Sequence, residues 1–119
     1  MNFFYKQARP YFLAEIGVNH NGSIVKAKKL IKSAKECGAN GVKFQTFKAK
    51  NLAEKNTPKV KYQIDRTSKK ESHYEMLKKL ELSFNDHVIL KNYCSKLNID
   101  FISTPYDFES AKFLKKLKI

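Results

Sequence analysis

Residues 11–46 read YFLAEIGVNHNGSIVKAKKLIKSAKECGANGVKFQT, and they predict the first two strands of the fold with the helix that joins them. The apolar run Tyr11–Ile16, set between a proline and a glycine, predicts a buried strand. Ser23 then supplies a helix N-cap, apolar residues recur at steps of three and four, and Gly38 ends the helix. Gly41–Thr46 predicts a second strand. Two strands joined by one helix in this way are expected to run parallel.

The rest of the chain adds a third strand of the same kind. Residues 47–71 lack a clear period and predict a long loop, which a helix over Ser72–Leu80 follows. The last three predicted elements are a helix opened by the capping box Ser83–Asp86, a strand over Asp100–Thr104 and a final helix capped by Asp107.

This order of elements predicts an α/β fold with a parallel sheet. Three strands alone make a poor sheet, and (β/α)8 barrels need about 250 residues. We therefore interpret residues 1–119 as one partial domain, the first three βα units of a (β/α)8 TIM barrel, truncated before the fourth strand. A complete small α/β domain is the alternative.

The composition narrows the expected partners and compartment. The chain has 119 residues, 24 Lys and Arg against 11 Asp and Glu, and a formal net charge of +13. Only Arg9 and Arg66 are arginine, and scattered lysine is typical of solvated helix faces, so we expect no nucleic-acid partner. No apolar run could span a bilayer and no signal peptide is evident, so we expect a cytoplasmic protein without a membrane partner. Cys37 and Cys94 lack CxxC spacing and are expected to be buried, reduced thiols.

Polar residues collect where the predicted strands end. Glu15 lies near the end of the first strand, Lys43 and Gln45 near the end of the second, and Thr104 at the end of the third. Ligand sites of parallel α/β folds lie at the carboxyl ends of the strands. Lys43 offers a charge to a phosphate or carboxylate, Thr104 offers a hydroxyl donor, and Glu15 can orient or deprotonate a substrate hydroxyl. The pattern predicts an anion-binding face.

Each assignment has a structural alternative. An internal ion pair would account for Glu15 and Lys43 without any ligand. The loop Asn19-His20-Asn21-Gly22 fits turn chemistry alone, because Asn and Gly tolerate positive φ. His20 has no second histidine or carboxylate at ligand spacing, so no metal site is predicted in this chain.

Four ordered blocks of the sequence carry a family resemblance. The blocks are Ala14–Ser23, Gly41–Phe47, Tyr74–Leu82 and Phe101–Pro105. Together they closely resemble the sialic acid synthase family, which comprises the N-acylneuraminate synthases and their legionaminate and pseudaminate relatives. Within the first block, the variant Glu-Ile-Gly-Val-Asn-His-Asn-Gly is more similar to the neuraminate and legionaminate enzymes than to the pseudaminate ones.

The resemblance implies a reaction and an architecture. The family condenses phosphoenolpyruvate with an N-acylated hexosamine such as N-acetylmannosamine, releases phosphate and forms a nine-carbon 2-keto acid. Its fold is a (β/α)8 barrel followed by a small antifreeze-like domain, and it uses a divalent metal, Mn²⁺ or Mg²⁺. The complete family enzyme is expected to be a homodimer. The family's metal ligands and its antifreeze-like domain are expected to lie outside residues 1–119, so we expect this chain alone to be inactive.

The resemblance also implies roles for single residues. Lys43 and Thr104 match phosphoenolpyruvate contacts. Glu15 matches a catalytic residue and Gln45 a site residue toward the enol or the sugar. The lesser neighbours of the site are expected to be Asn19, His20 and Tyr74.

Two other functions stay open from the sequence. One is a related aldolase of the octulosonate-phosphate type, which also condenses phosphoenolpyruvate but would need basic residues for a second phosphate. The other is a lysine-rich α/β module that binds an anionic polymer without catalysis; steep salt dependence of binding would favour it.

Overall fold

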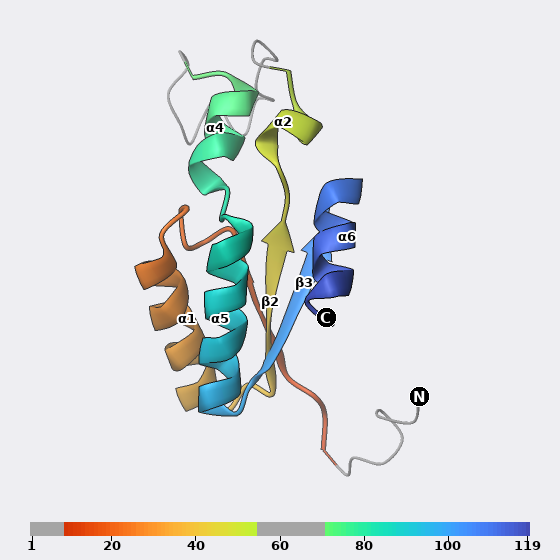
Figure 1. The fold of residues 1–119 in the computed structure, drawn as a ribbon. Coiled ribbons are helices and arrows are strands. Elements are labelled where there is room, and N and C mark those ends of the chain that lie inside the picture. The colour runs from red at the N-terminus through yellow and green to blue at the C-terminus, as the bar shows by residue number, and fades with distance from the viewer. Residues whose placement is uncertain (1–8, 55–70) are drawn as a thin grey trace.

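The computed structural model describes residues 9–54 and 71–119. Strands and helices alternate along most of this chain (Figure 1). The elements are, in order, β1 (Leu13–Gly17), α1 (Ile24–Glu36), β2 (Gly41–Thr46), α2 (Ala49–Leu52), α4 (His73–Leu80), α5 (Phe84–Leu97), β3 (Asp100–Pro105) and α6 (Phe108–Lys116).

The three strands form one parallel sheet in the order β1-β2-β3. In the register of the first pair Glu15 lies opposite Lys43, and in the second pair Gln45 lies opposite Thr104. All strands therefore present their carboxyl ends at the same edge. The predicted α/β fold with a parallel sheet is confirmed.

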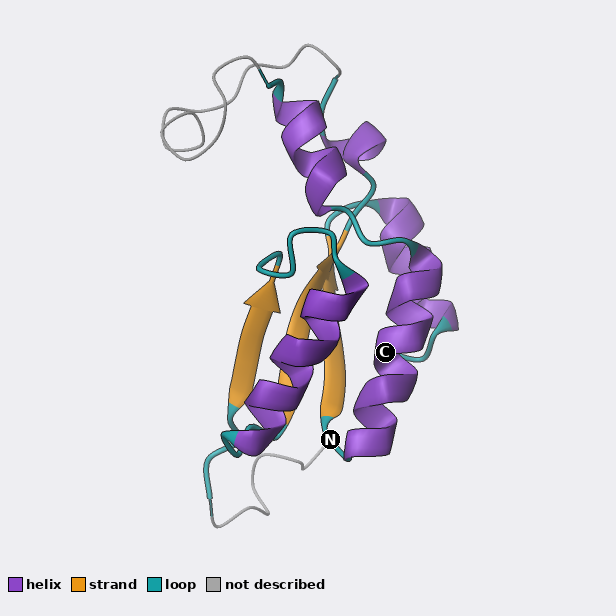
Figure 2. Cartoon of the chain, turned by 90° about the vertical axis from the view of Figure 1, so that its left-hand side faces the viewer, coloured by secondary structure: helices purple, strands orange, loops and turns teal. Residues whose placement is uncertain are grey.

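The helices α1 and α5 cover one face of this sheet, which we call the helix face (Figure 2). Successive side chains of a strand point to opposite faces. The helix face thus receives Ile16 of β1, Phe44 of β2 and Phe101 of β3. The opposite side, which we call the open face, carries the side chains of Leu13, Glu15, Lys43, Gln45, Ile102 and Thr104.

The core lies between the helix face and α1 and α5. Its buried members are Ile16, Ala27, Ile31, Val42, Phe44, Leu82, Leu90, Cys94 and Ile99. Burying one such large apolar side chain contributes roughly 1.5–3 kcal/mol. Both sheet and helices are anchored by this one cluster, so the strand ends rest on a packed support.

The helix ends follow the signals in the sequence. Ser23 accepts a hydrogen bond from the backbone of Lys26 at the start of α1, and a complete capping box joins Ser83 and Asp86 at the start of α5. Asp107 caps α6 in the same way. Such caps stabilise a helix by about 1 kcal/mol each. The predicted starts of these three helices are confirmed.

Two predictions fail in detail. The segment predicted as a loop over 47–71 contains the four-residue helix α2, and residues 55–70 of it lie outside the described part of the chain. Cys94 is buried as predicted, but Cys37 is exposed, because it is the C-cap residue of α1 and lies past its packed turns.

The helices α2 and α4 lie beyond the carboxyl ends of the strands (Figure 1). These two helices therefore lie above the edge at which the polar residues gather. Across the described residues, every helix is too short or too polar to cross a membrane.

Candidate functional site

The sheet brings four predicted site residues to one place on the open face. Lys43 and Gln45 lie at alternate positions of β2. Glu15 of β1 lies opposite Lys43 in the register, and Thr104 of β3 lies opposite Gln45. The arrangement follows from the two-residue period of the strands, which sends positions 43 and 45 to the same side. The carboxyl end of the open face therefore holds a cation, a carboxylate, an amide and a hydroxyl.

Glu15 and Lys43 form an ion pair. Lys43 Nζ lies 2.7 Å from Glu15 Oε2, with side-chain exposures of 35% for Lys43 and 51% for Glu15. The hydrogen bond from Lys43 to Glu15 raises the pKa of Lys43 further above its ordinary value, which already leaves the ammonium charged at neutral pH. Glu15 and Lys43 thus form the ion pair named as the structural alternative. The pair is not internal, however, because both groups reach solvent. An ammonium has three donors, so Lys43 retains hydrogen bonds for an incoming anion.

A bulge at the end of β1 makes room beside this pair. The register advances from Glu15 opposite Lys43 to Gly17 opposite Phe44, which leaves one extra residue in β1. Gly17 has φ +55°, and a Cβ placed on it would lie 3.4 Å from Glu15 Oε1 and 3.6 Å from Gln45 Nε2. The glycine therefore sits between the Glu15 and Gln45 side chains and keeps the space between them free.

The loop after β1 is a series of tight turns. Backbone hydrogen bonds run from Asn19 to Ile16 and from Asn21 to Val18, and Asn21 and Gly22 both have positive φ. A Cβ on Gly22 would lie 2.2 Å from the carbonyl oxygen of Lys79. The turn chemistry predicted for this loop is present, and it presses the loop against the end of α4.

His20 points away from the open face. Its ring is 1% exposed and stacks on Phe44 of the helix face, with ring centroids 5.9 Å apart. The Gly22 N–H donates to Nδ1 over 3.0 Å, and burial lowers the pKa of His20, so the ring is neutral. The structure therefore does not bring His20 together with Lys43, and Asn19 belongs to the intervening turn.

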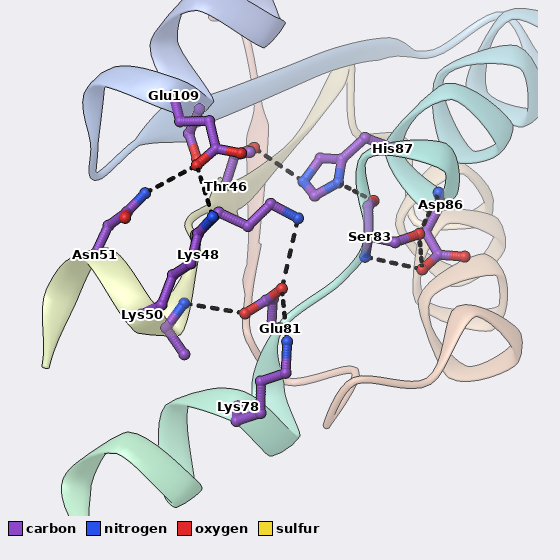
Figure 3. A network of polar contacts seen from close by, with 12 residues as sticks. Thr46, Lys48, Lys50, Asn51, Lys78, Glu81, Ser83, Asp86, His87 and Glu109 are labelled. Atoms are coloured by element: carbon purple, nitrogen blue, oxygen red, sulfur yellow. Dashed lines mark hydrogen bonds and ion pairs between the residues drawn. The ribbon is translucent and has the colours of Figure 1, made fainter. Parts of the chain in front are cut away.

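Tyr74 lies on α4, in the segment beyond the strand ends (Figure 1). Glu81, which follows α4, is the acceptor of a partly buried polar cluster shown in Figure 3. Its carboxylate accepts from the Ala49 N–H at 2.9 Å and contacts Lys78 at 3.1 Å and Lys48 at 3.5 Å. Burial alone would raise the pKa of Glu81, but these donors and charges outweigh it and lower that pKa. The cluster ties the two ends of the α2–α4 segment together.

Sequence reasoning missed a second polar cluster beneath the site. Thr46 Oγ1 lies 2.9 Å from His87 Nε2 and 2.6 Å from Ser103 Oγ, and all three side chains are buried (Figure 3 shows the first contact). The available signal was a hydroxyl residue at a helix-face position in each of two neighbouring strands. Nothing local in the sequence indicated that the partner would be His87 on α5.

The described residues do not form a metal site. Within 9–54 and 71–119, no three His, Cys, Asp or Glu side chains lie close enough together to hold an ion. The divalent metal implied by the family resemblance thus finds no ligand set in this part of the chain, and we assign none of these residues to it.

The fold and the arrangement of the site residues together indicate a class of protein. A parallel α/β sheet with charged and polar side chains gathered at the carboxyl ends of its strands is the arrangement of a ligand-binding α/β enzyme unit. The model of the NeuB family matches residues 30–119, and the chain belongs to that family.

Curated relatives agree with this assignment. N,N'-diacetyllegionaminic acid synthase of Legionella pneumophila is 47% identical over 114 residues, which cover 92% of this chain and 32% of that protein. Pseudaminic acid synthase of Helicobacter pylori is 31% identical over 111 residues, or 91% of this chain and 32% of that protein. The resemblance to sialic acid synthases is confirmed, and identity is higher to the legionaminic acid enzyme than to the pseudaminic acid one.

A solved structure shows the same fold. The N-acetylneuraminic acid synthetase of Leptospira borgpetersenii matches with a TM-score of 0.72 and 26% identity, over 93% of this chain and 34% of that one. This chain therefore spans about a third of the length of the relatives it matches. Its homologues are sialic-acid-type synthases, so it belongs to a family of enzymes.

Proposed function

We propose that this chain is the phosphoenolpyruvate-binding part of a sialic-acid-type nonulosonate synthase. The reaction condenses phosphoenolpyruvate with an N-acyl hexosamine, such as N-acetylmannosamine, to a nine-carbon 2-keto acid and releases phosphate. The observation that carries the proposal is the convergence of Glu15, Lys43, Gln45 and Thr104 on one face, at the carboxyl ends of β1–β3 in a NeuB family chain.

The site chemistry supports distinct roles for these residues. Lys43 is a charged donor with free hydrogen-bonding capacity, which suits the phosphate or carboxylate of phosphoenolpyruvate. Thr104 adds a neutral hydroxyl donor on the neighbouring strand. Glu15 orients the Lys43 ammonium and is placed to hold or deprotonate a hydroxyl of the acceptor sugar. Gln45, across Gly17 from Glu15, orients the same substrate region.

The half-exposed open face supports the wider architecture that we propose. In a (β/α)8 barrel this face would line the interior, and β1–β3 with their helices would be its first three units. We further propose that the complete enzyme is a cytoplasmic homodimer with a divalent metal and an antifreeze-like domain. When bound, such a metal would supply Lewis-acid activation of the sugar aldehyde.

The proposal is tested in a fusion of this chain to the remaining two thirds of the Legionella pneumophila relative. Phosphate release is measured with phosphoenolpyruvate, N-acetylmannosamine and Mn²⁺. Lys43→Met is expected to raise the KM for phosphoenolpyruvate about tenfold or more, because one charge-assisted contact is lost. Glu15→Gln is expected to lower kcat about 100-fold, the scale of a lost acid–base group.

Lys32→Met is the matched control, because Lys32 also pairs with a glutamate but lies on the exposed surface of α1. It should leave KM and kcat unchanged. An active fusion in which Lys43→Met behaves like Lys32→Met would remove Lys43 from the site. A fusion that folds but releases no phosphate with any N-acyl hexosamine would refute the proposed reaction.

A further inference from the structure

The buried polar cluster under the strand ends is a continuous chain of hydrogen bonds. It runs from the Ser83 carbonyl to His87 Nδ1 over 2.8 Å, from His87 Nε2 to Thr46 Oγ1 over 2.9 Å, and from there to Ser103 Oγ over 2.6 Å. Thr46 and His87 are 0% exposed and Ser103 is 8% exposed. The chain connects α5, β2 and β3 at the edge where the site lies.

The direction of every hydrogen bond in this chain follows from its first member. A backbone carbonyl can only accept, so the ring proton of His87 is on Nδ1. Burial lowers the pKa of His87, against the opposing effect of the Ser83 and Gln45 carbonyls, and the ring is therefore neutral. Its Nε2 then accepts from the Thr46 hydroxyl, whose oxygen accepts from Ser103. In this tautomer His87 donates to the Ser83 carbonyl, Thr46 donates to His87, and Ser103 donates to Thr46.

The same two strands carry site residues on their other side. Gln45 directly precedes Thr46, and Thr104 directly follows Ser103. Neighbouring residues of a strand point to opposite faces, so holding one side chain in place restrains the shared backbone and with it the Cα–Cβ direction of the next residue. The Gln45 carbonyl also lies close enough to the His87 ring to act on its pKa.

We propose that Thr46, His87 and Ser103 are positioning residues that hold Gln45 and Thr104 in the geometry needed for phosphoenolpyruvate. This inference rests on the proposed function for the identity of the ligand. The positioning of Gln45 and Thr104 is itself a property of the ligand-free protein. Hydrogen bonds between these buried side chains depend on distance and angle, so they restrict the relative movement of β2 and β3 more than apolar contacts, which tolerate small shifts.

The test uses the isotope-labelled 119-residue chain and Thr46→Val, which keeps the side-chain shape and removes the hydroxyl. NMR should show the neutral His87 ring protonated on Nδ1, and the Nε2 signal should move in the variant. The amide signals of Gln45 and Thr104 should also shift, and the χ1 couplings of Thr104 should become averaged. Glu15 also lies on the open face but makes none of these hydrogen bonds. Its NMR signals should therefore stay in place.

Phosphoenolpyruvate binding to the fusion protein described above, followed by titration, gives the second measurement. Thr46→Val and His87→Leu should weaken binding about tenfold, equivalent to roughly 1.4 kcal/mol. His87→Gln restores an acceptor for the Thr46 hydroxyl and should stay within about threefold of the parent fusion protein. Ser110→Ala removes a buried hydroxyl on α6 outside the chain of hydrogen bonds and should change neither the spectra nor the binding.

The outcomes separate this inference from the proposed function. If the parent fusion protein does not bind phosphoenolpyruvate, the proposed ligand contacts fail, and the NMR signals of the 119-residue chain alone decide the positioning role. Unmoved Gln45 and Thr104 signals in Thr46→Val overturn the positioning role, as does equal loss of binding in His87→Gln and His87→Leu. Should Thr46→Val not fold, Ser103→Ala breaks the same chain at its other end and replaces it.

Discussion

The two faces of the sheet are built from alternate residues of the same strands, yet they have opposite properties. On the helix face Phe44 is fully buried and packs between His20 and Phe101. On the open face its neighbour Lys43 is paired with Glu15 and partly solvated. The comparison teaches that one face supplies the free energy of folding, and the other can therefore hold charged groups for a ligand.

Substitutions at neighbouring positions of β2 should separate the two faces most strongly. Phe44→Ala removes a fully buried ring and should lower the free energy of unfolding by about 3–5 kcal/mol. Lys43→Met removes an exposed ion pair and should leave the unfolding midpoint nearly unchanged. Urea denaturation followed by circular dichroism measures both. Equal losses in the two variants would contradict the division between the faces.

A smaller effect is expected where the site loop meets α4. Gly22→Ala combines positive φ with a Cβ 2.2 Å from the Lys79 carbonyl oxygen. Gly38→Ala has the same backbone problem, since φ is +86°, but nothing lies within 4 Å of its Cβ. We expect Gly38→Ala to cost about 1–2 kcal/mol, the penalty for the left-handed conformation, and Gly22→Ala to cost more. Thermal unfolding of the two variants measures both losses of stability. If Gly22→Ala lost no more stability than the control Gly38→Ala, the loop would be free to move away from α4.

The smallest effect concerns the two buried histidines of the helix face. Burial lowers the pKa of His20 and His87 below the ordinary value near 6.5. The unfolded chain therefore takes up protons first, and the free energy of unfolding should fall as pH drops below about 6.5, with both histidines contributing. Glu81 and Asp107 have lowered pKa values too, but their contribution is lost only below about 4.5.

Denaturation at several pH values between these limits isolates the histidines. His87→Gln should remove about half of the pH dependence in that window, because one of the two buried rings is gone. A flat profile from pH 7 to 5 in the parent chain would mean that the two rings are not held neutral by the fold.

Features that depend on neighbouring residues were predictable. The cap at Ser23, the capping box at Ser83 and the two-residue alternation of Gly41–Thr46 all arise within a few positions and appear as expected. The convergence of Glu15 and Lys43 was also predictable, because parallel strands end at one edge. The four-residue helix α2 was not, since it is too short to show a period.

The burial of His20 and the partners of His87 were beyond sequence reasoning for a different reason. His20 stands in a loop of polar residues, and its place against Phe44 depends on how the loop folds over the end of the sheet. His87 meets Thr46 across 41 positions of the chain. Such contacts depend on the register of the strands and on the rotation of α5, neither of which the local pattern specifies.

By itself the sequence determined the alternation of strands and helices, the family, and the set of polar residues at the strand ends, because period, caps and motifs are local properties. Only the tertiary structure decided which of these residues meet. The register placed Glu15 opposite Lys43, and the bulge before Gly17 left room between Glu15 and Gln45. Packing against α5 then buried the hydrogen bonds that link His87, Thr46 and Ser103 under the site. These are long-range contacts, and their geometry exists only once the sheet and its helices have packed together.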